Sequence, residues 1–193
     1  MKTQNDSWLE VINGDRLRLV TFTEKHIQAT YLSWLNNVEI VRFTNQRFKR
    51  HSEASCLAYL HSFKDTNNRF FAIEHIKSGE MMGTLTMYIH LHHRTADLGI
   101  LIGETGQWGK GYGQEAFALA VNTLFSIGKI RKVTAGTLSC NVGMIKIMQT
   151  CGMTLEATQK DQELVDGEPF DILYFAKFIN TDAPTTANAS PAP

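Results

Sequence analysis

Alternating and periodic apolar positions in the first third of the chain predict a strand followed by two helices. Residues 16–22 alternate between polar and apolar side chains, as is typical of a half-buried strand. Thr23 can cap the helix that follows, in which apolar residues recur at helical spacing over 27–35. A second amphipathic stretch opens at Ser52 and runs to Phe63. We therefore expect a pair of helices before the sheet continues.

The middle of the chain contains three β-like runs, at 69–76, 80–90 and 95–103. They are separated by the short polar segments 77–79 and 92–94, both of which suit tight turns. Consecutive strands joined by such turns form antiparallel pairs. This part of the sequence therefore predicts an antiparallel meander at the centre of the fold.

The last third of the chain is predicted to add two helices and three strands. A wide apolar stripe predicts a helix over 115–127, ended by Gly128. The remaining elements are a strand at 132–138, a helix at 141–151, and a strand pair at 153–159 and 170–179 around the Asp166-Gly167 turn. The order β-α-α-β-β-β-α-β-α-β-β predicts one α/β domain of the α+β kind over 1–180, with a mainly antiparallel central sheet flanked by helices.

Composition adds limits on partners. The chain has 193 residues, 43% hydrophobic and 20% charged, which suits one domain with a sizeable core. Nineteen basic and nineteen acidic residues cancel, so no overall field would recruit nucleic acid, and we expect no nucleic-acid partner. Residues 181–193 hold no large apolar side chain, and we expect a disordered tail there.

Cysteine content and hydropathy suggest a location. The odd number of cysteines, Cys56, Cys140 and Cys151, favours reduced thiols over a disulfide framework. Neither an apolar leader nor a run long enough to cross a bilayer is present, so we expect a cytoplasmic protein with no membrane partner.

Three histidines near one predicted turn raise the question of a metal site. His90, His92 and His93 have no matched cysteine or acidic ligand nearby in the sequence. A hairpin tip explains them more simply, and we expect no metal.

Three alternate glycines, Gly109, Gly111 and Gly113, directly precede the apolar helix predicted at 115–127. Glycine lets backbone N–H groups approach an anion, and the start of a helix adds the positive end of its dipole. The spacing matches neither a Walker loop nor the Gly-x-Gly-x-x-Gly dinucleotide fingerprint. The cluster predicts a phosphate site of another kind, or alternatively a glycine-rich helix entry without a ligand.

Three segments together resemble the acetyl-CoA core of the GNAT N-acetyltransferases: 96–102, 108–116 and 141–152. The chain is most similar to the branch containing the ribosomal-protein N-terminal acetyltransferases, over about 14–179. The resemblance implies a GNAT-like acyltransferase fold, acetyl-CoA as co-substrate, and transfer of its acetyl group to a primary amine.

The resemblance also assigns the cofactor site. Loop amides would bind the CoA pyrophosphate, the pantetheine arm would pair with a strand edge, and Asn141 would be the family's cofactor-side asparagine, although it can also be a simple N-cap. The residues assigned to the cofactor are Ile100, Leu101, Ile102, Trp108, Gly109, Lys110, Gly111, Tyr112, Gly113, Gln114, Asn141, Met144 and Met148.

Attack of a neutral amine on a thioester requires a proton acceptor, an oxyanion donor and a proton for the departing thiolate. Asp97 is the preferred candidate base, directly or through water, and Glu74 is the second candidate. The family often carries a serine or a tyrosine near the thiol, where this chain has Met144 and Met148. Tyr174 on the last predicted strand is the substitute candidate acid.

A basic segment with interleaved aromatics covers 42–50, where the family places its acceptor. Arg42, Arg47, Lys49 and Arg50 are candidate acceptor-binding residues, or a solvated loop. An anionic acceptor such as a nucleotide-linked amino sugar would fit them, and so would an acidic or ribosomal protein N-terminus. Over the whole sequence we expect the acceptor to be a protein or peptide N-terminus or a small amine, with an amino-sugar nucleotide as the alternative. An inert CoA-binding module is a further alternative, and a monomer or a homodimer is compatible with the sequence.

Overall fold

The computed structural model describes residues 10–179. The helices and strands, in chain order, are β1 (Val11–Asn13), β2 (Leu17–Thr21), η2 (Glu24–His26), α1 (Ala29–Leu35), α2 (Val38–Val41), η3 (Asn45–Phe48), α3 (Glu53–His61), β3 (Arg69–His75), β4 (Met81–His90), β5 (Thr95–Ile102), η4 (Thr105–Gln107), α4 (Tyr112–Ser126), β6 (Lys132–Leu138), α5 (Val142–Thr150), β7 (Thr154–Val165) and β8 (Glu168–Phe178).

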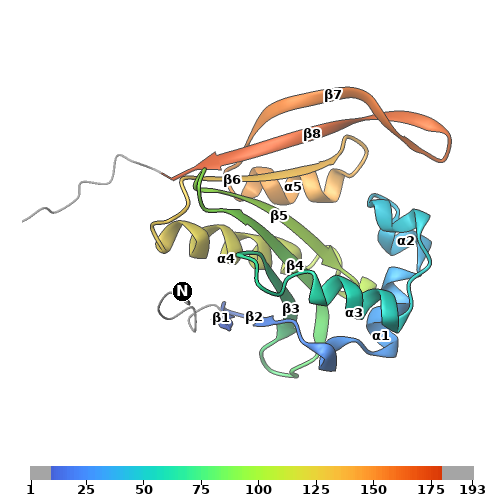
Figure 1. The fold of residues 1–193 in the computed structure, drawn as a ribbon. Helices are drawn as coiled ribbons and strands as arrows, with labels where there is room; N and C mark the ends of the chain where they lie inside the picture. Colours follow the sequence, from blue (N-terminus) through green and yellow to red (C-terminus); the bar gives the residue numbers. More distant parts are fainter. Residues whose placement is uncertain (1–9, 180–193) are drawn as a thin grey trace, which may run out of the picture.

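The strands form one sheet of eight in the order β1-β2-β3-β4-β5-β6-β8-β7 (Figure 1). Every neighbouring pair is antiparallel except β5 and β6, which run parallel. The mixed, mainly antiparallel α/β architecture expected from the sequence is therefore confirmed, including the β3-β4-β5 meander. The single parallel pair arises because α4 crosses over between β5 and β6.

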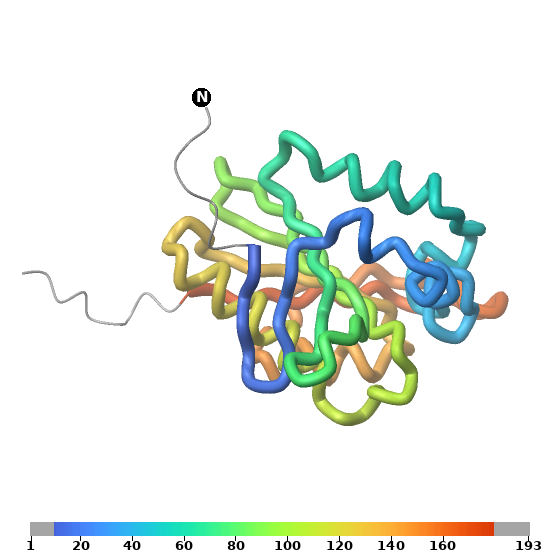
Figure 2. The backbone as a smooth tube through the Cα atoms, turned by 90° about the horizontal axis from the view of Figure 1, so that it is seen from below, coloured from blue at the N-terminus to red at the C-terminus, as the bar shows by residue number. Residues whose placement is uncertain are grey.

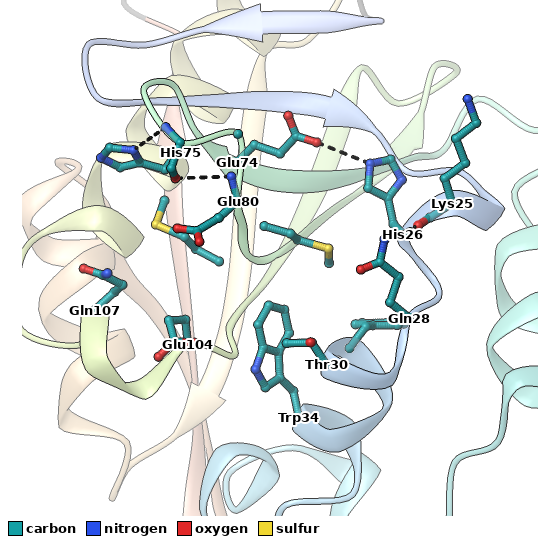
Figure 3. Close-up of a pocket in the computed structure, with 15 residues that line it drawn as sticks. Lys25, His26, Gln28, Thr30, Trp34, Glu74, His75, Glu80, Glu104 and Gln107 are labelled. Atoms are coloured by element: carbon teal, nitrogen blue, oxygen red, sulfur yellow. Dashed lines mark hydrogen bonds and ion pairs between the residues drawn. The ribbon is translucent and has the colours of Figure 1, made fainter.

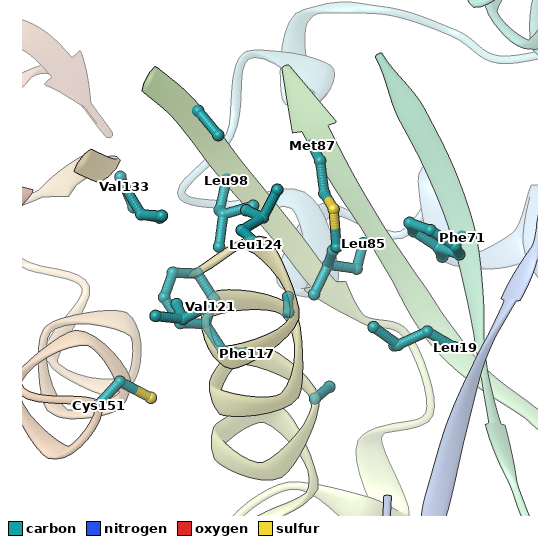
Figure 4. Close-up of a cluster of buried hydrophobic side chains, with 14 of the residues drawn as sticks. Leu19, Phe71, Leu85, Met87, Leu98, Phe117, Val121, Leu124, Val133 and Cys151 are labelled. Carbon is teal, nitrogen blue, oxygen red and sulfur yellow. The ribbon is translucent and has the colours of Figure 1, made fainter. Parts of the chain in front are cut away.

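Helices cover both faces of the sheet and bury a core on each. On one face, Phe117, Val121 and Leu124 of α4 pack against strand residues such as Leu85 and Leu98, all nearly inaccessible to solvent (Figure 4). On the other face, a smaller core joins α1 and α3 to β3, and it includes Tyr31, Trp34, Cys56 and Phe70. Figure 2 shows α3 on the side of the sheet opposite α4.

The helix and strand ends follow the capping and turn chemistry of the sequence. Ser52 caps α3 by accepting a hydrogen bond of 3.3 Å from the Ser55 amide. Asp166 and Gly167 both have positive φ, 54° and 88°, as a tight hairpin turn between β7 and β8 requires. The turn predicted around Asp166 and Gly167 is confirmed. The cap predicted at Thr23 is wrong for the helix α1: Thr23 is the N-cap of the short η2, and Gln28 is the N-cap of α1.

Two parts of the fold differ from the pattern-based expectation. The strands β7 and β8 are longer than predicted and form a hairpin that extends past the sheet (Figure 1). The outer strand β7 is exposed along most of its length, so burial imposes no alternating pattern that could be recognised in 160–165. The short elements α2 and η3 were also not predicted, because four residues are too few to establish a periodicity.

The predicted disordered tail at 181–193 lies outside the described residues. In the part of the chain that the structure describes, no helix is both long and apolar enough to cross a membrane.

Candidate active site

The parallel strands β5 and β6 separate after three residue pairs. Thr95, Ala96 and Asp97 pair with Lys132, Val133 and Thr134. Beyond this point β5 continues to pair with β4 as far as Ile102, and β6 continues to pair with β8 as far as Leu138. The two strands therefore diverge, and a gap opens in the middle of the sheet (Figure 1).

A cavity of about 650 Å³ occupies this gap. Its walls come from the β5 edge, the glycine loop, β6, the start of α5 and, at the open side, the segment around α2. The lining residues are Glu39, Ile40, Phe43, Thr44, Leu98, Gly99, Ile100, Leu101, Ile102, Gln107, Trp108, Gly109, Gly111, Tyr112, Gly113, Gln114, Gly136, Thr137, Asn141, Gly143, Met144, Lys146 and Ile147.

The exposed edge of β5 inside the cavity can accept an extended ligand. Among the described strands, β5 beyond Asp97 pairs only with β4, so its peptide groups on the gap side have no strand partner. Such an edge can pair with an amide-bearing chain laid along it.

The glycine loop presents unpaired amides at the start of α4. Gly111 is the N-cap residue, with φ of +83°, a conformation that glycine adopts at little cost. The first backbone N–H that returns to the loop is that of Glu115, which donates to the Gly111 carbonyl at 3.0 Å. Within residues 10–179, the N–H groups of Gly111 and of 112–114 have no backbone acceptor. These amides and the positive end of a 15-residue helix dipole favour an anion.

Trp108 fixes the loop against the end of β5. Its indole Nε1 donates a hydrogen bond of 2.8 Å to the Ile102 carbonyl, while almost half of the residue is exposed. This bond joins the cavity's strand edge to its glycine loop.

Asn141 caps α5 and also lines the cavity. Its Oδ1 accepts from the Met144 amide at 3.2 Å, so it is the N-cap of α5. Its Nδ2 donates to Thr137 Oγ1 at 3.0 Å, and both residues line the cavity. The cap is confirmed, and the contact with a cofactor stays a prediction.

The remaining candidate cofactor residues are divided between the cavity wall and other positions. Met144 lines the cavity, whereas Met148 is fully buried in the core on the α4 face and contributes no surface to it. Lys110 is exposed and is also outside the cavity lining. The burial of Met148 corrects its assignment: the helical spacing of α5 turns this residue toward the sheet.

Asp97 lies where the gap closes. Thr134 Oγ1 donates a hydrogen bond of 2.6 Å to its carboxylate. Burial raises the pKa of Asp97, while the Thr134 hydrogen bond and the neighbouring His90 oppose that rise. Asp97 does not line the cavity itself, although its neighbour Leu98 does.

Tyr174 lies behind the opposite wall. It pairs across the β8-β6 ladder with Gly136, whose missing Cβ leaves room for the Tyr174 ring at 3.1 Å from the Cβ position. Its hydroxyl donates to Gln159 Oε1 at 3.3 Å. Gly136 therefore lies between Tyr174 and the cavity, and Tyr174 itself does not line the cavity.

Glu74 belongs to a different cavity, of about 700 Å³, beside α1 and the β3-β4 turn (Figure 3). Its carboxylate contacts Arg18 at 2.8 Å and His26 at 3.4 Å, and its side chain is only 12% exposed. Glu74 thus has structural partners of its own, and the structure separates it from Asp97.

The basic segment is used largely to hold α2 and η3 against the β7-β8 hairpin. Arg42 contacts Asp166 at 2.7 Å, and Arg47 contacts Glu163 at 3.2 Å. Arg47 also donates to the Thr44 and Leu164 carbonyls, at 2.8 and 3.2 Å. Lys49 and Arg50 are exposed and differ from the other two in having no such contact with the hairpin.

No metal centre is found in the described part of the chain: residues 10–179 contain no group of three His, Cys, Asp or Glu side chains arranged to hold an ion.

Comparison with known protein families shows which family the chain belongs to. A model of the acetyltransferase (GNAT) domain matches residues 16–154. The chain belongs to the GNAT acetyltransferase family. Its GNAT domain therefore includes the splayed strands, the glycine loop and the start of α5. A search of curated protein sequences finds no significant match.

Solved structures share the GNAT fold at low sequence identity. RimL, a ribosomal L7/L12 alpha-N-protein acetyltransferase in complex with coenzyme A, is 19% identical with a TM-score of 0.79, covering 90% of this chain and 100% of that one. Spermidine N-acetyltransferase from Vibrio cholerae, in complex with CoA and spermine, is 18% identical with a TM-score of 0.75, covering 86% and 97%. A GNAT acetyltransferase from Bacillus anthracis is 18% identical with a TM-score of 0.75, covering 87% and 98%.

Sequence reasoning missed part of the cavity wall in this GNAT domain. Ile40, Phe43 and Thr44 close the open side, and Gly136 and Thr137 form the β6 side. These three residues in and after α2 carry no recognisable motif, and they reach the cavity because the basic segment is fastened to the β7-β8 hairpin.

Proposed function

We propose that this protein is an acetyl-CoA-dependent N-acetyltransferase that transfers the acetyl group directly to a primary amine. The observation that carries the proposal is the cavity between the splayed strands, with an unpaired strand edge on one side and unpaired helix amides at one end. The amides of 111–114 suit a pyrophosphate, and the β5 edge suits the pantetheine amides.

In this arrangement the thioester lies deeper in the gap, toward the pair formed by Asp97 and Thr134. The amine nitrogen attacks the acetyl carbon, a C–N bond forms, and a β5 amide near Leu101 stabilises the oxyanion. Collapse breaks the C–S bond and releases CoA thiolate. Asp97 accepts the amine proton through a water molecule, since it lies behind the cavity wall rather than in it.

Tyr174 is the proposed source of the proton for the thiolate. It lies behind Gly136, where the wall is thinnest because a side chain is missing. Its role requires the hydroxyl to leave Gln159, to which it donates at 3.3 Å.

A neutral or cationic amine, such as a small amine or a protein N-terminus, is the acceptor that the contacts favour. Arg42 and Arg47 are already paired with Asp166 and Glu163, which reduces the positive charge that they offer to an anionic acceptor. Titrating a panel of amines would separate the alternatives. An amino-sugar nucleotide as acceptor predicts that Lys49→Ala and Arg50→Ala raise its KM, whereas a neutral acceptor predicts no change.

Calorimetry and a turnover assay test the proposal together. Acetyl-CoA should bind saturably and raise the melting temperature, whereas NADH should do neither. Release of CoA with at least one amine then distinguishes the enzyme from an inert CoA-binding module. Absence of acetyl-CoA binding would rule out both.

A further inference from the structure

Arg16 connects the N-terminal hairpin to the glycine loop, although about a hundred residues separate them in the chain. Its Nε donates to Glu115 Oε2 at 2.6 Å, and its backbone amide donates to Glu115 Oε1 at 2.7 Å. The Leu17 amide adds a third donor to the same carboxylate, at 3.3 Å. Glu115 lies in the first turn of α4, so the hairpin is fastened to the start of this helix.

The same guanidinium also contacts the loop directly. Its NH1 donates to the Lys110 carbonyl at 3.0 Å, and its Cζ lies 4.4 Å from the centre of the Tyr112 ring. A Cβ at Gly111 would lie 3.4 Å from its NH2. Arg16 therefore touches three consecutive loop residues and the first turn of the helix.

The Lys110 contact sets the direction of a cavity amide. In a planar trans peptide the C=O and the following N–H point in opposite directions. Because Arg16 holds the Lys110 carbonyl on its own side, the Gly111 N–H points away from Arg16, and Gly111 lines the cavity. Gly111 N–H is one of the unpaired amides described above.

Arg16 also offsets an unfavourable charge. A carboxylate in the first turn of α4 would repel a bound phosphate group, but the guanidinium is paired with it and supplies the compensating charge. Burial opposes ionisation of Glu115, but the Arg16 backbone and side-chain hydrogen bonds outweigh it and lower the pKa of this carboxyl.

We infer that Arg16 is a positioning residue for the CoA pyrophosphate: through the Lys110 carbonyl and Glu115 it orients the loop amides and neutralises the acid in the first turn of α4. The inference rests on the proposed function, since it needs a CoA-type ligand in this cavity. It assigns a binding role to a residue in the turn between β1 and β2, far from the glycine motif in sequence.

The test compares two ligands. CoA contains the pyrophosphate, whereas pantetheine lacks it. Calorimetry measures the binding of CoA and ligand-detected NMR the binding of pantetheine, and the comparison isolates the contribution of the pyrophosphate. Arg16→Ala should raise the Kd for CoA about tenfold, equivalent to about 1.4 kcal/mol, and leave pantetheine binding unchanged. Arg16→Lys should recover part of the affinity, because it keeps the charge without the fork of donors.

Arg94→Ala is the matched control. Arg94 also fastens one end of α4, donating to the Gly128 and Lys129 carbonyls at 3.1 and 3.3 Å, but at the opposite end of the helix, about 22 Å away. It should lower the melting temperature without changing the Kd for CoA. Arg16→Gln is the second test variant, since it keeps the Arg16 backbone donor to Glu115 while it removes the guanidinium, and it should raise the Kd for CoA several-fold.

The inference fails if Arg16→Ala binds CoA as tightly as the wild type, or if it loses CoA and pantetheine by the same factor, as a merely structural role would require. If Arg16→Ala does not fold, an unchanged Kd for Arg16→Gln has the same meaning. Absence of CoA binding to the wild-type protein would instead overturn the proposed function, and this inference with it.

Discussion

Thr134 donates a hydrogen bond of 2.6 Å to the carboxylate of Asp97, and these two residues form the last pair that joins β5 to β6. The closed end of the splayed strands is therefore marked by a half-buried acid that accepts a hydrogen bond from a hydroxyl. This relationship connects the geometry of the sheet to the acid-base chemistry of the proposed reaction.

Asp97→Asn should lower kcat about 100-fold while preserving the fold, if Asp97 accepts the amine proton. Because burial raises the pKa of Asp97, its contribution to stability is present below the ordinary aspartate pKa and is lost as the pH rises through the raised value. At pH 7 the substitution should therefore leave the melting temperature unchanged or higher.

The pH profile checks the same assignment. Only ionised Asp97 can accept a proton, so kcat/KM of the wild type should fall as the pH is lowered through the raised pKa, at higher pH than for an ordinary aspartate. The Asn variant should lack this acidic limb. A variant with full activity and an unchanged profile would assign the base elsewhere.

Gly111→Ala should weaken CoA binding. Gly111 has φ of +83°, where a Cβ costs about 1–2 kcal/mol, and relaxing that strain would reorient the loop amides. Gly128→Ala provides the control, since Gly128 has φ of +68° at the other end of α4 with open space around it. Thermal unfolding should show similar losses for both variants, and calorimetry a higher Kd only for Gly111→Ala. Equal Kd values would argue against the loop as the pyrophosphate site.

Asn141→Asp should separate capping from cofactor binding. Aspartate caps a helix as well as asparagine does, so the melting temperature should stay close to that of the wild type. The substitution removes the donor to Thr137 and adds a negative charge to the cavity wall, which should raise the Kd for CoA several-fold.

Ser52→Ala is the corresponding control, because Ser52 caps α3 away from the cavity. It should destabilise by about 1 kcal/mol without affecting CoA. Retention of normal CoA affinity in Asn141→Asp would reduce Asn141 to its capping role.

Arg47→Ala should destabilise the protein by about 1–3 kcal/mol, since its side chain is only 11% exposed and its removal takes one donor each from the Glu163 carboxylate and the Thr44 and Leu164 carbonyls. Lys49→Ala, at an exposed position two residues away, should change stability by less than about 0.5 kcal/mol. Denaturant unfolding measures both. Equal, small effects would mean that the basic segment is not held by the hairpin.

The parts of the fold that the sequence predicted well are those in which burial imposes a period. Successive residues of β3 alternate between the two cores, with Phe71 and Ile73 in one and Phe70 and Ala72 in the other. Helix α4 buries one helical face. The β3-β4-β5 meander and α4 both appear as expected. The β7-β8 hairpin was underestimated because exposed residues such as Lys160 and Asp161 follow no buried pattern.

Only part of the cavity wall could be predicted, because some of its residues follow a local sequence pattern and others do not. The glycine loop and Asn141 have recognisable local chemistry, so the sequence located them. Phe43 in the wall and Arg16 behind the loop depend on contacts between segments distant in the chain, which no local spacing encodes. Charge alone also could not show that Arg47 pairs with Glu163, because the two residues lie 116 positions apart.

The central claim is that the gap between β5 and β6 is an acyl-CoA site. Isothermal titration of acetyl-CoA into the wild-type protein tests it most directly. The account predicts saturable binding at one molecule per chain, abolished or strongly weakened by Gly111→Ala. Heats no larger than dilution at millimolar acetyl-CoA would contradict it.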